Sequence, residues 1–335
     1  MQAAIYGLEG LELTGDERKF FLEAEPAGFI LFKRNCGDPD QLLKLTNSLR
    51  DLTGRTDLPI LIDQEGGRVA RMRPPEWPAF PAAERFSQLY ALAPSSAIEA
   101  VRSNARALAL MLRTCGINVN ALPLLDVRQE GATDIIGDRA LGNAPMQVAA
   151  LGRAVLDGME SAGVVGIIKH MPGHGRALVD SHKELPVVTA SAEELEVDLE
   201  PFERLSQSPM GMTAHVVYEA WDAERPASLS PIVIRDIIRE RIGFDGWLMS
   251  DDIGMEALQG DFASRASGVV AAGCDVALHC SGKMDEMIAV ASAVPAMSSE
   301  GQERLDRALA ATRTDLAPLN FAEEISKRDQ LLALA

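Results

Sequence analysis

The chain has 335 residues, of which 47% are hydrophobic, so it can bury a sizeable core in one large domain or two medium ones. Its formal charge of −17, without any basic cluster, argues against a nucleic acid or an anionic membrane surface as a partner. The four cysteines are scattered, with no CxxC pair, as is typical of free thiols in a reducing compartment. The N-terminus lacks the pattern of a signal peptide and no run of about 18 apolar residues occurs, so we expect a cytoplasmic protein.

Short apolar runs rich in Val, Ile and Leu recur along the chain and predict buried parallel strands. The expected strands lie near Ala4–Leu8, Gly28–Phe32, Leu58–Asp63, Val119–Val127, Gly166–His170, Gly211–Val217, Trp247–Ser250 and Val276–His279. The amphipathic stretches between them include Gln41–Leu52, Ile98–Cys115, Pro145–Met159, Ala192–Leu205 and Val233–Arg241. This alternation predicts a (β/α)8 TIM barrel forming a single domain over residues 1–335, although a doubly wound open sheet with fewer strands gives a similar pattern.

Polar side chains follow five consecutive predicted strands. They are the run from Asp63 to Arg68, then Asp126, the pair Lys169 and His170, then His215, and the pair Asp251 and Asp252. A single Asp at a strand end is usually a helix cap or a turn former. Barrels of this type carry their chemistry at the C-terminal ends of the strands, so the five sets together indicate one functional rim.

Three of the five histidines fall between residues 169 and 182. His170, His174 and His182, with Asp180, are ligand types that a metal accepts. A proline and two glycines in the segment exclude the helical histidine pair of a zincin, so we expect a loop and no metal. The Asp180 carboxylate can orient the His182 imidazole as a proton shuttle, and the glycines predict a loop that is mobile without ligand.

Six segments in order along the chain resemble the bacterial β-N-acetylglucosaminidases of glycoside hydrolase family 3, single-domain enzymes of cell-wall recycling. The segments are Gly28–Asn35 (GFILFKRN), Ile62–Arg71 (IDQEGGRVAR), Gly137–Gly142 (GDRALG), Lys169–His182 (KHMPGHG, then DSH), Met212–Tyr218 (MTAHVVY) and Ser250–Ala257 (SDDIGMEA). The histidine-rich segment is especially specific, because other branches of the family use a carboxylate from a second domain instead of the Asp-His pair. The resemblance implies a TIM barrel that hydrolyses a carbohydrate without a cofactor.

The resemblance also implies a role for each site residue. Asp251 matches the nucleophile that forms a covalent glycosyl-enzyme intermediate, His182 matches the general acid/base, and Asp180 orients His182. The positions that match contacts to the terminal sugar are Asp63, Arg71, Arg139, Lys169 and His170. A helix cap for the nucleophile and a rim salt bridge for the two arginines are the alternatives.

Four neighbouring residues match no sugar contact and are expected to support the site, and the role of His174 stays open. The four are Arg68, Asp126, Asp138 and His215. The implied reaction removes terminal N-acetylglucosamine with retention from muropeptides, in which this sugar is linked to 1,6-anhydro-N-acetylmuramic acid. Its rivals are a phosphorylase, substrate-assisted hydrolysis, a non-catalytic sugar sensor and a metal hydrolase. No heptad seam or apolar patch is visible by pattern, so a monomer is expected.

Overall fold

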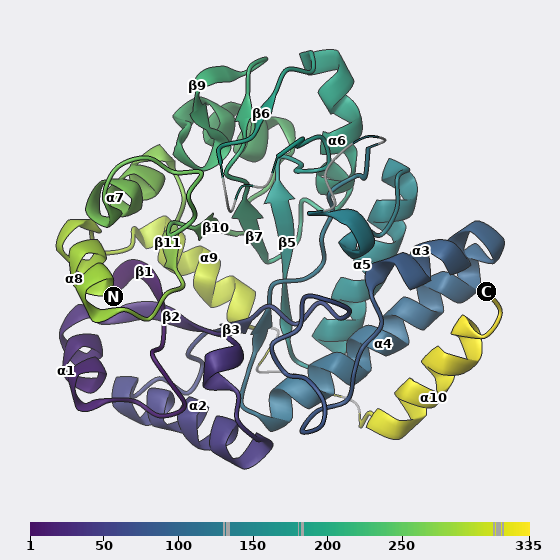
Figure 1. The fold of residues 1–335 in the computed structure, drawn as a ribbon, viewed down its shortest axis with the longest axis horizontal. Coiled ribbons are helices and arrows are strands. Elements are labelled where there is room, and N and C mark those ends of the chain that lie inside the picture. The colour runs from purple at the N-terminus through teal and green to yellow at the C-terminus, as the bar shows by residue number, and fades with distance from the viewer. Residues whose placement is uncertain are drawn as a thin grey trace.

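The computed structural model describes residues 1–335 except for 130, 132–134, 180, 182–183, 311, 313–315 and 317. Eight parallel strands close into a barrel in which each predicted strand contributes one member (Figure 1). These strands are β1 (Gln2–Gly7), β2 (Pro26–Leu31), β3 (Ile60–Ile62), β4 (Val119–Asn120), β5 (Val165–Met171), β7 (Met210–Thr213), β10 (Trp247–Asp252) and β11 (Val276–His279). The predicted (β/α)8 barrel is confirmed.

Helices surround the barrel (Figure 1). They are α1 (Gly15–Ala24), α2 (Pro39–Thr53), α3 (Ala83–Leu92), α4 (Pro94–Thr114), α5 (Pro145–Ser161), α6 (Ala192–Arg204), η4 (Val233–Arg241), α7 (Phe262–Ala272), α8 (Met284–Ala293), α9 (Ser299–Ala310) and α10 (Phe321–Leu332). Each of the five helices expected from the sequence is present, and η4 is a π-helix instead of an α-helix. Within the described part of the chain, no helix combines the length and apolar character needed to cross a membrane.

Local sequence sets the helix boundaries, as α2 illustrates. Asp38 precedes the helix, and its side chain accepts a hydrogen bond from the Gln41 N–H, which has no partner inside the helix. Pro39 occupies the first turn, where its missing N–H costs nothing. Gly54 ends the helix with φ of 66°, a left-handed conformation that favours glycine.

The barrel interior is filled by apolar side chains, and α9 closes its N-terminal end. The interior cluster includes Ile5, Ile30, Leu61, Val119, Ile167, Met210, Met212, Trp247, Met249, Val276 and Leu278, together with Leu305, Ala308 and Leu309 of α9. Because α9 packs beneath the strands, the opposite, C-terminal end is the one left open for a site.

Three strands, β3, β4 and β7, are shorter than the sequence indicated. Beyond β4, Pro123 has no N–H to donate, and the Leu122 N–H donates to the Asn120 carbonyl oxygen at 2.8 Å, so the regular ladder is interrupted before Leu124 pairs again with Lys169. Beyond β7, the Ser228 N–H donates to the Ala214 carbonyl oxygen at 3.2 Å, so this backbone pairs outside the barrel. A separate small sheet follows, made of β6 (Val187–Val188), β8 (Val217–Tyr218) and β9 (Asp222–Pro226).

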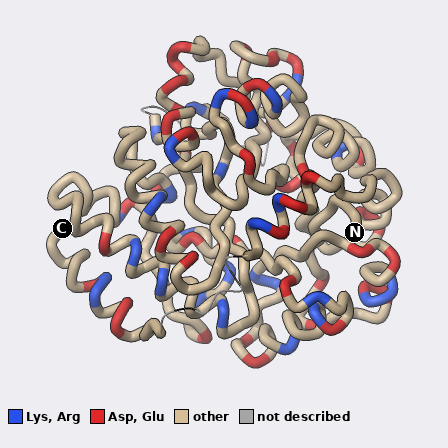
Figure 2. Tube along the Cα trace, turned by 180° about the vertical axis from the view of Figure 1, so that it is seen from behind, with Lys and Arg blue, Asp and Glu red and all other residues tan. Residues whose placement is uncertain are grey.

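Charged residues cover the outside of the molecule with both signs intermixed. Along the backbone trace seen from behind, Lys and Arg positions are scattered among Asp and Glu positions (Figure 2). With a formal charge of −17, this intermixing agrees with the expectation that a polyanion is not a partner.

Candidate active site

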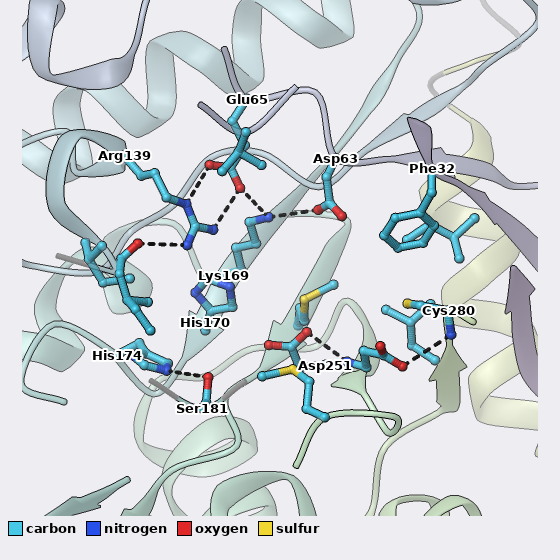
Figure 3. A pocket seen from close by; sticks show the side chains of 18 of the residues that line it. Phe32, Asp63, Glu65, Arg139, Lys169, His170, His174, Ser181, Asp251 and Cys280 are labelled. Carbon is cyan, nitrogen blue, oxygen red and sulfur yellow. Dashed lines mark hydrogen bonds and ion pairs between the residues drawn. The ribbon is translucent and has the colours of Figure 1, made fainter. Parts of the chain in front are cut away.

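A cavity of about 230 Å³ opens at the C-terminal ends of the barrel strands (Figure 3). It brings together the predicted nucleophile and all five predicted sugar contacts, although they come from strands far apart in the sequence. The charged and histidine side chains around it are Asp63, Glu65, Arg71, Arg139, Lys169, His170, His174, Asp251 and Asp252. The predicted acid/base His182 and its partner Asp180 lie outside the described residues.

Asp63 directly follows β3 and pairs with two of the predicted sugar-binding cations. Arg71 Nη2 lies 3.0 Å from one carboxylate oxygen, and Lys169 Nζ, from β5, lies 3.2 Å from the other. Burial by itself raises the pKa of Asp63, but the charges of Lys169 and Arg71 outweigh it and hold the pKa well below its usual range. The carboxylate is therefore ionised at neutral pH and can accept hydrogen bonds from hydroxyl groups.

Glu65 forms the second carboxylate of the same wall, and sequence reasoning gave it no role. Its two oxygens accept hydrogen bonds from Nε and Nη2 of Arg139, each at 2.9 Å. Lys169 Nζ lies 2.8 Å from the Oε1 atom of Glu65. An alternating row of charges results, running from Arg139 through Glu65, Lys169 and Asp63 to Arg71. Burial opposes the charge on Glu65, yet Lys169 and Arg139 hold its pKa below the usual value.

Both arginines are thus ion-paired, as the rim salt-bridge alternative expected, but both also line the cavity. Arg71 keeps a buried Nε atom with no hydrogen-bond partner among the residues that the structure describes. A buried donor without a partner is costly, so this arginine is held in place at the expense of one hydrogen bond.

Asp126 holds His170 and His174 in place, which is the supporting role expected for it. Its buried carboxylate lies 2.8 Å from His170 Nδ1 and accepts the N–H groups of His170 and His174 at 3.1 and 2.7 Å. Burial opposes its ionisation, but the neighbouring His170 lowers the pKa of Asp126 to about 2. The bond to Nδ1 directs the opposite edge of the His170 ring away from Asp126.

Asp251 is the penultimate residue of β10 and lines the cavity across from the charged wall (Figure 3). One of its oxygens accepts the Asp252 N–H at 2.8 Å. Burial raises the pKa of Asp251, but the nearby His170 and His215 outweigh burial and lower it. The carboxylate is therefore ionised, which is the state that a nucleophile requires.

Asp252 is next in sequence but has a different environment. Its Oδ1 atom accepts the N–H groups of Gly254 and Cys280 at 2.9 and 3.2 Å. Burial raises the pKa of Asp252 to about 6, and the negative charge of Asp251 acts in the same direction. Two adjacent carboxyl groups thus differ in their readiness to ionise, and Asp251 is the stronger acid.

The other three predicted supporting positions also contact the rim. Arg68 pairs with Asp138 at 2.7 Å. His215 Nδ1 lies 2.6 Å from the Ser228 hydroxyl, and its Nε2 lies 3.0 Å from the Asp252 carbonyl oxygen. Among the described residues, which omit Asp180 and His182, no three His, Cys, Asp or Glu side chains are grouped closely enough to hold a metal ion.

The rim of this TIM barrel carries an ionised carboxylate, and a wall of ion-paired side chains faces it across a small polar cavity. This is the arrangement of a glycoside hydrolase. Residues 5–313 match the glycosyl hydrolase family 3 N terminal domain. The chain therefore belongs to glycosyl hydrolase family 3.

Relatives of known sequence and structure agree with this membership. The chain is 39% identical over 281 residues to a beta-hexosaminidase of Methylococcus capsulatus, covering 82% of each protein. A beta-hexosaminidase of Alkalilimnicola ehrlichii is also 39% identical, with 82% of this chain and 79% of that protein covered. The crystal structure of NagZ from Neisseria gonorrhoeae with N-trifluoroacetyl-D-glucosamine superimposes with a TM-score of 0.88 at 32% identity, over 99% of this chain and 98% of that one.

Proposed function

We propose that the chain is a retaining exo-β-N-acetylglucosaminidase that removes terminal, non-reducing N-acetylglucosamine from muropeptides in cell-wall recycling. The chain is a β-N-acetylhexosaminidase of family 3, and its similar relatives are beta-hexosaminidases. NagZ, a structural neighbour, binds a derivative of glucosamine. Residues 1–335 act in this proposal as one catalytic domain, a monomer in the cytoplasm that needs no cofactor.

One observation carries the proposal: an ionised Asp251 shares a small cavity with a wall of three cations and two carboxylates. The volume of about 230 Å³ suits one sugar unit and is below the range of about 300 to 1,000 Å³ common for larger ligands. A neutral sugar with many hydroxyl groups suits alternating donors and acceptors better than a highly charged ligand does. The size of the cavity supports cleavage at the chain end.

In the proposed mechanism, the Asp251 carboxylate attacks the anomeric carbon, and the bond from that carbon to the leaving oxygen breaks. His182, oriented by Asp180, donates its proton to this oxygen. A water molecule then attacks the same carbon of the glycosyl ester, gives its proton to His182, and releases Asp251. Two displacements at one carbon retain its configuration.

The remaining residues bind the sugar in this proposal. Asp63 accepts hydrogen bonds from hydroxyl groups, while Arg71, Arg139, Lys169 and His170 act as donors to hydroxyl and acetamido groups. All five of these side chains line the cavity, which supports these roles. Each charged donor is already paired with a carboxylate, so it is held in place before the sugar arrives, which lowers the entropic cost of binding.

The first test measures release of 4-nitrophenol from 4-nitrophenyl N-acetyl-β-glucosaminide by wild type and by Asp251→Asn, Asp252→Asn and His182→Ala variants. We expect activity to nearly vanish in Asp251→Asn, kcat to fall steeply in His182→Ala because the base of the second step is lost, and activity to persist within about tenfold in Asp252→Asn. Asp252→Asn is the matched control because it removes the neighbouring carboxyl of the same strand. An active Asp251→Asn enzyme would contradict the assignment of the nucleophile.

Product analysis separates the rival reactions. Free sugar in phosphate buffer indicates a hydrolase, whereas a sugar phosphate indicates a phosphorylase. A 2-fluoro sugar, which lacks the acetamido group, should become trapped on Asp251; substrate-assisted hydrolysis would leave it inert. A sugar sensor would bind without turnover, and a metal hydrolase would lose its activity with a chelator, which we expect to have no effect.

A further inference from the structure

Ser181 separates Asp180 from His182 in the sequence, and it is described although its two neighbours are not. Only 3% of its surface is exposed. Two other segments hold it. His174 Nε2 lies 3.3 Å from the Ser181 hydroxyl (Figure 3), and the Ala257 N–H donates to the Ser181 carbonyl oxygen at 3.3 Å.

His174 is itself fixed on the barrel. Its N–H donates to the buried Asp126 carboxylate at 2.7 Å, and its ring packs edge-on against the His170 ring with centroids 5.7 Å apart. The following residue, Gly175, lies so close to the barrel that an added Cβ would come within 1.9 Å of the Val127 carbonyl oxygen. The backbone next to His174 therefore packs directly against the segment at Val127, which only a glycine allows.

The His174 ring is buried and electrically neutral at pH 7. Burial lowers its pKa to about 4, and the neighbouring His170 acts in the same direction. A neutral imidazole has one nitrogen that donates and one that accepts, and the Ser181 hydroxyl can serve either. Such a ring is poorly suited to protonate a leaving group, but it can hold a hydroxyl in place.

We propose that His174 is a positioning residue: by holding Ser181 against the barrel, it restrains the residue to which Asp180 and His182 are directly bonded in the chain. Ala257, which follows the Asp251 strand, holds the same residue from the other side. The pair thus sets the distance between the segment with the proton donor and the segment with the nucleophile. This inference rests on the proposed function, in which His182 supplies the proton.

The test uses leaving groups that need the proton to different degrees. We compare kcat/KM, which reports formation of the glycosyl enzyme, for the 4-nitrophenyl, phenyl and benzyl N-acetyl-β-glucosaminides, whose leaving oxygens become steadily more basic. His174→Phe and Ser181→Ala should each lose about threefold on the first substrate and about 100-fold on the last, because only a basic leaving oxygen requires a well-placed acid. The double variant should lose no more than either single variant.

Three further variants make the result decisive. His174→Gln can present an amide near the Nε2 position and should recover most of the benzyl activity. Leu178→Ala, in the same loop and 67% exposed, should behave as wild type. Suppose that the loss in His182→Ala rises steeply with the basicity of the leaving oxygen. Equal losses on all three substrates in His174→Phe and Ser181→Ala, or no loss, then overturn the positioning role. If His182→Ala itself loses the same factor in kcat/KM on all three substrates, the assignment of His182 as the acid is overturned instead.

Discussion

Glu65 illustrates how a single carboxylate can organise a binding wall. Both of its oxygens are occupied by Arg139 and Lys169, two of the cations proposed to contact the sugar. Only 5% of its side-chain surface is exposed, so water cannot replace it. Without this charge, Arg139 would lose its carboxylate partner, and the three cations of the row would be left with the single carboxylate of Asp63.

We expect Glu65→Gln to lower the free energy of unfolding by about 3 kcal/mol, since it leaves buried positive charge uncompensated. It should also lower kcat/KM by about tenfold or more, because Arg139 and Lys169 lose their fixed positions. Urea unfolding and steady-state kinetics measure the two effects.

The matched control is Glu200→Gln. Glu200 pairs with Arg204 at 2.7 Å, but the Glu200 side chain is 34% exposed and that of Arg204 is 48% exposed. The change should therefore lower the free energy of unfolding by less than about 1 kcal/mol and leave activity intact. Equal costs for the two variants would show that the Glu65 pairs contribute no more than a surface ion pair.

Asp252 should make stability depend on pH. Its pKa is raised from an ordinary 3.8 to about 6 in the folded protein, so the folded state holds a proton that the unfolded chain releases. This contribution to stability is complete below about pH 4 and is lost as the pH rises through about 6. Above that, ionised Asp252 lies beside ionised Asp251.

Asp252→Asn removes this ionisation but keeps an oxygen for the Gly254 and Cys280 N–H groups. The Tm of the variant minus that of wild type should therefore become more positive between about pH 4 and pH 7. Scanning calorimetry across this range provides the measurement. The pKa values of Asp63, Glu65 and Asp251 are lowered, so these groups stabilise the folded state at pH values above their unfolded pKa. They are present in both proteins, so their effects cancel in the difference between the two Tm values. A constant difference would contradict the raised pKa.

At the scale of elements, α9 and the catalytic rim lie at opposite ends of the barrel. Leu305, Ala308 and Leu309 of α9 pack into the interior cluster beneath the strands, and Leu305 is fully buried. Arg304 and Arg307 pin the same helix to Asp245. Stability and catalysis should therefore be separable in this part of the fold.

We expect Leu305→Ala to destabilise the protein by about 3 kcal/mol, because it leaves a cavity where the helix meets the barrel. Below the unfolding transition, kcat and KM should stay at the wild-type values. Leu334→Ala, whose leucine is 59% exposed, serves as the control and should change stability by less than about 0.5 kcal/mol. Chemical denaturation measures both, and a changed KM in Leu305→Ala would show that the two ends are coupled.

At the scale of the whole molecule, we predict a single copy in solution. Large exposed apolar residues occur on separate elements, such as Leu22 on α1, Leu92 on α3 and Met146 on α5. Scattered residues of this kind are normal on monomers. The net charge of −17 also makes two copies repel each other at low ionic strength.

Sedimentation velocity should therefore give one species of 36.0 kDa over a wide concentration range. The same should hold at low and moderate salt, because an association suppressed only by charge would strengthen as salt screens it. A mass that rises towards a dimer with concentration would contradict a monomeric enzyme.

The sequence by itself determined the barrel and where its site lies. Parallel strands buried on both faces leave apolar runs that can be read locally, and parallel strands that close into a barrel must bring their C-terminal ends together. Asp63, Lys169 and Asp251 could therefore be assigned to one rim before any contact was known. Their meeting in one cavity confirms that reasoning.

Only the tertiary structure decided which groups pair within that rim. Arg139 and Glu65 are 74 residues apart, and Lys169 and Asp63 are 106 apart, so no local spacing links them. The separation of the Asp251 and Asp252 pKa values likewise depends on burial and on charges from other strands. Periodicity reports which face of an element is buried, whereas pairing and ionisation depend on what the closed barrel places opposite that face.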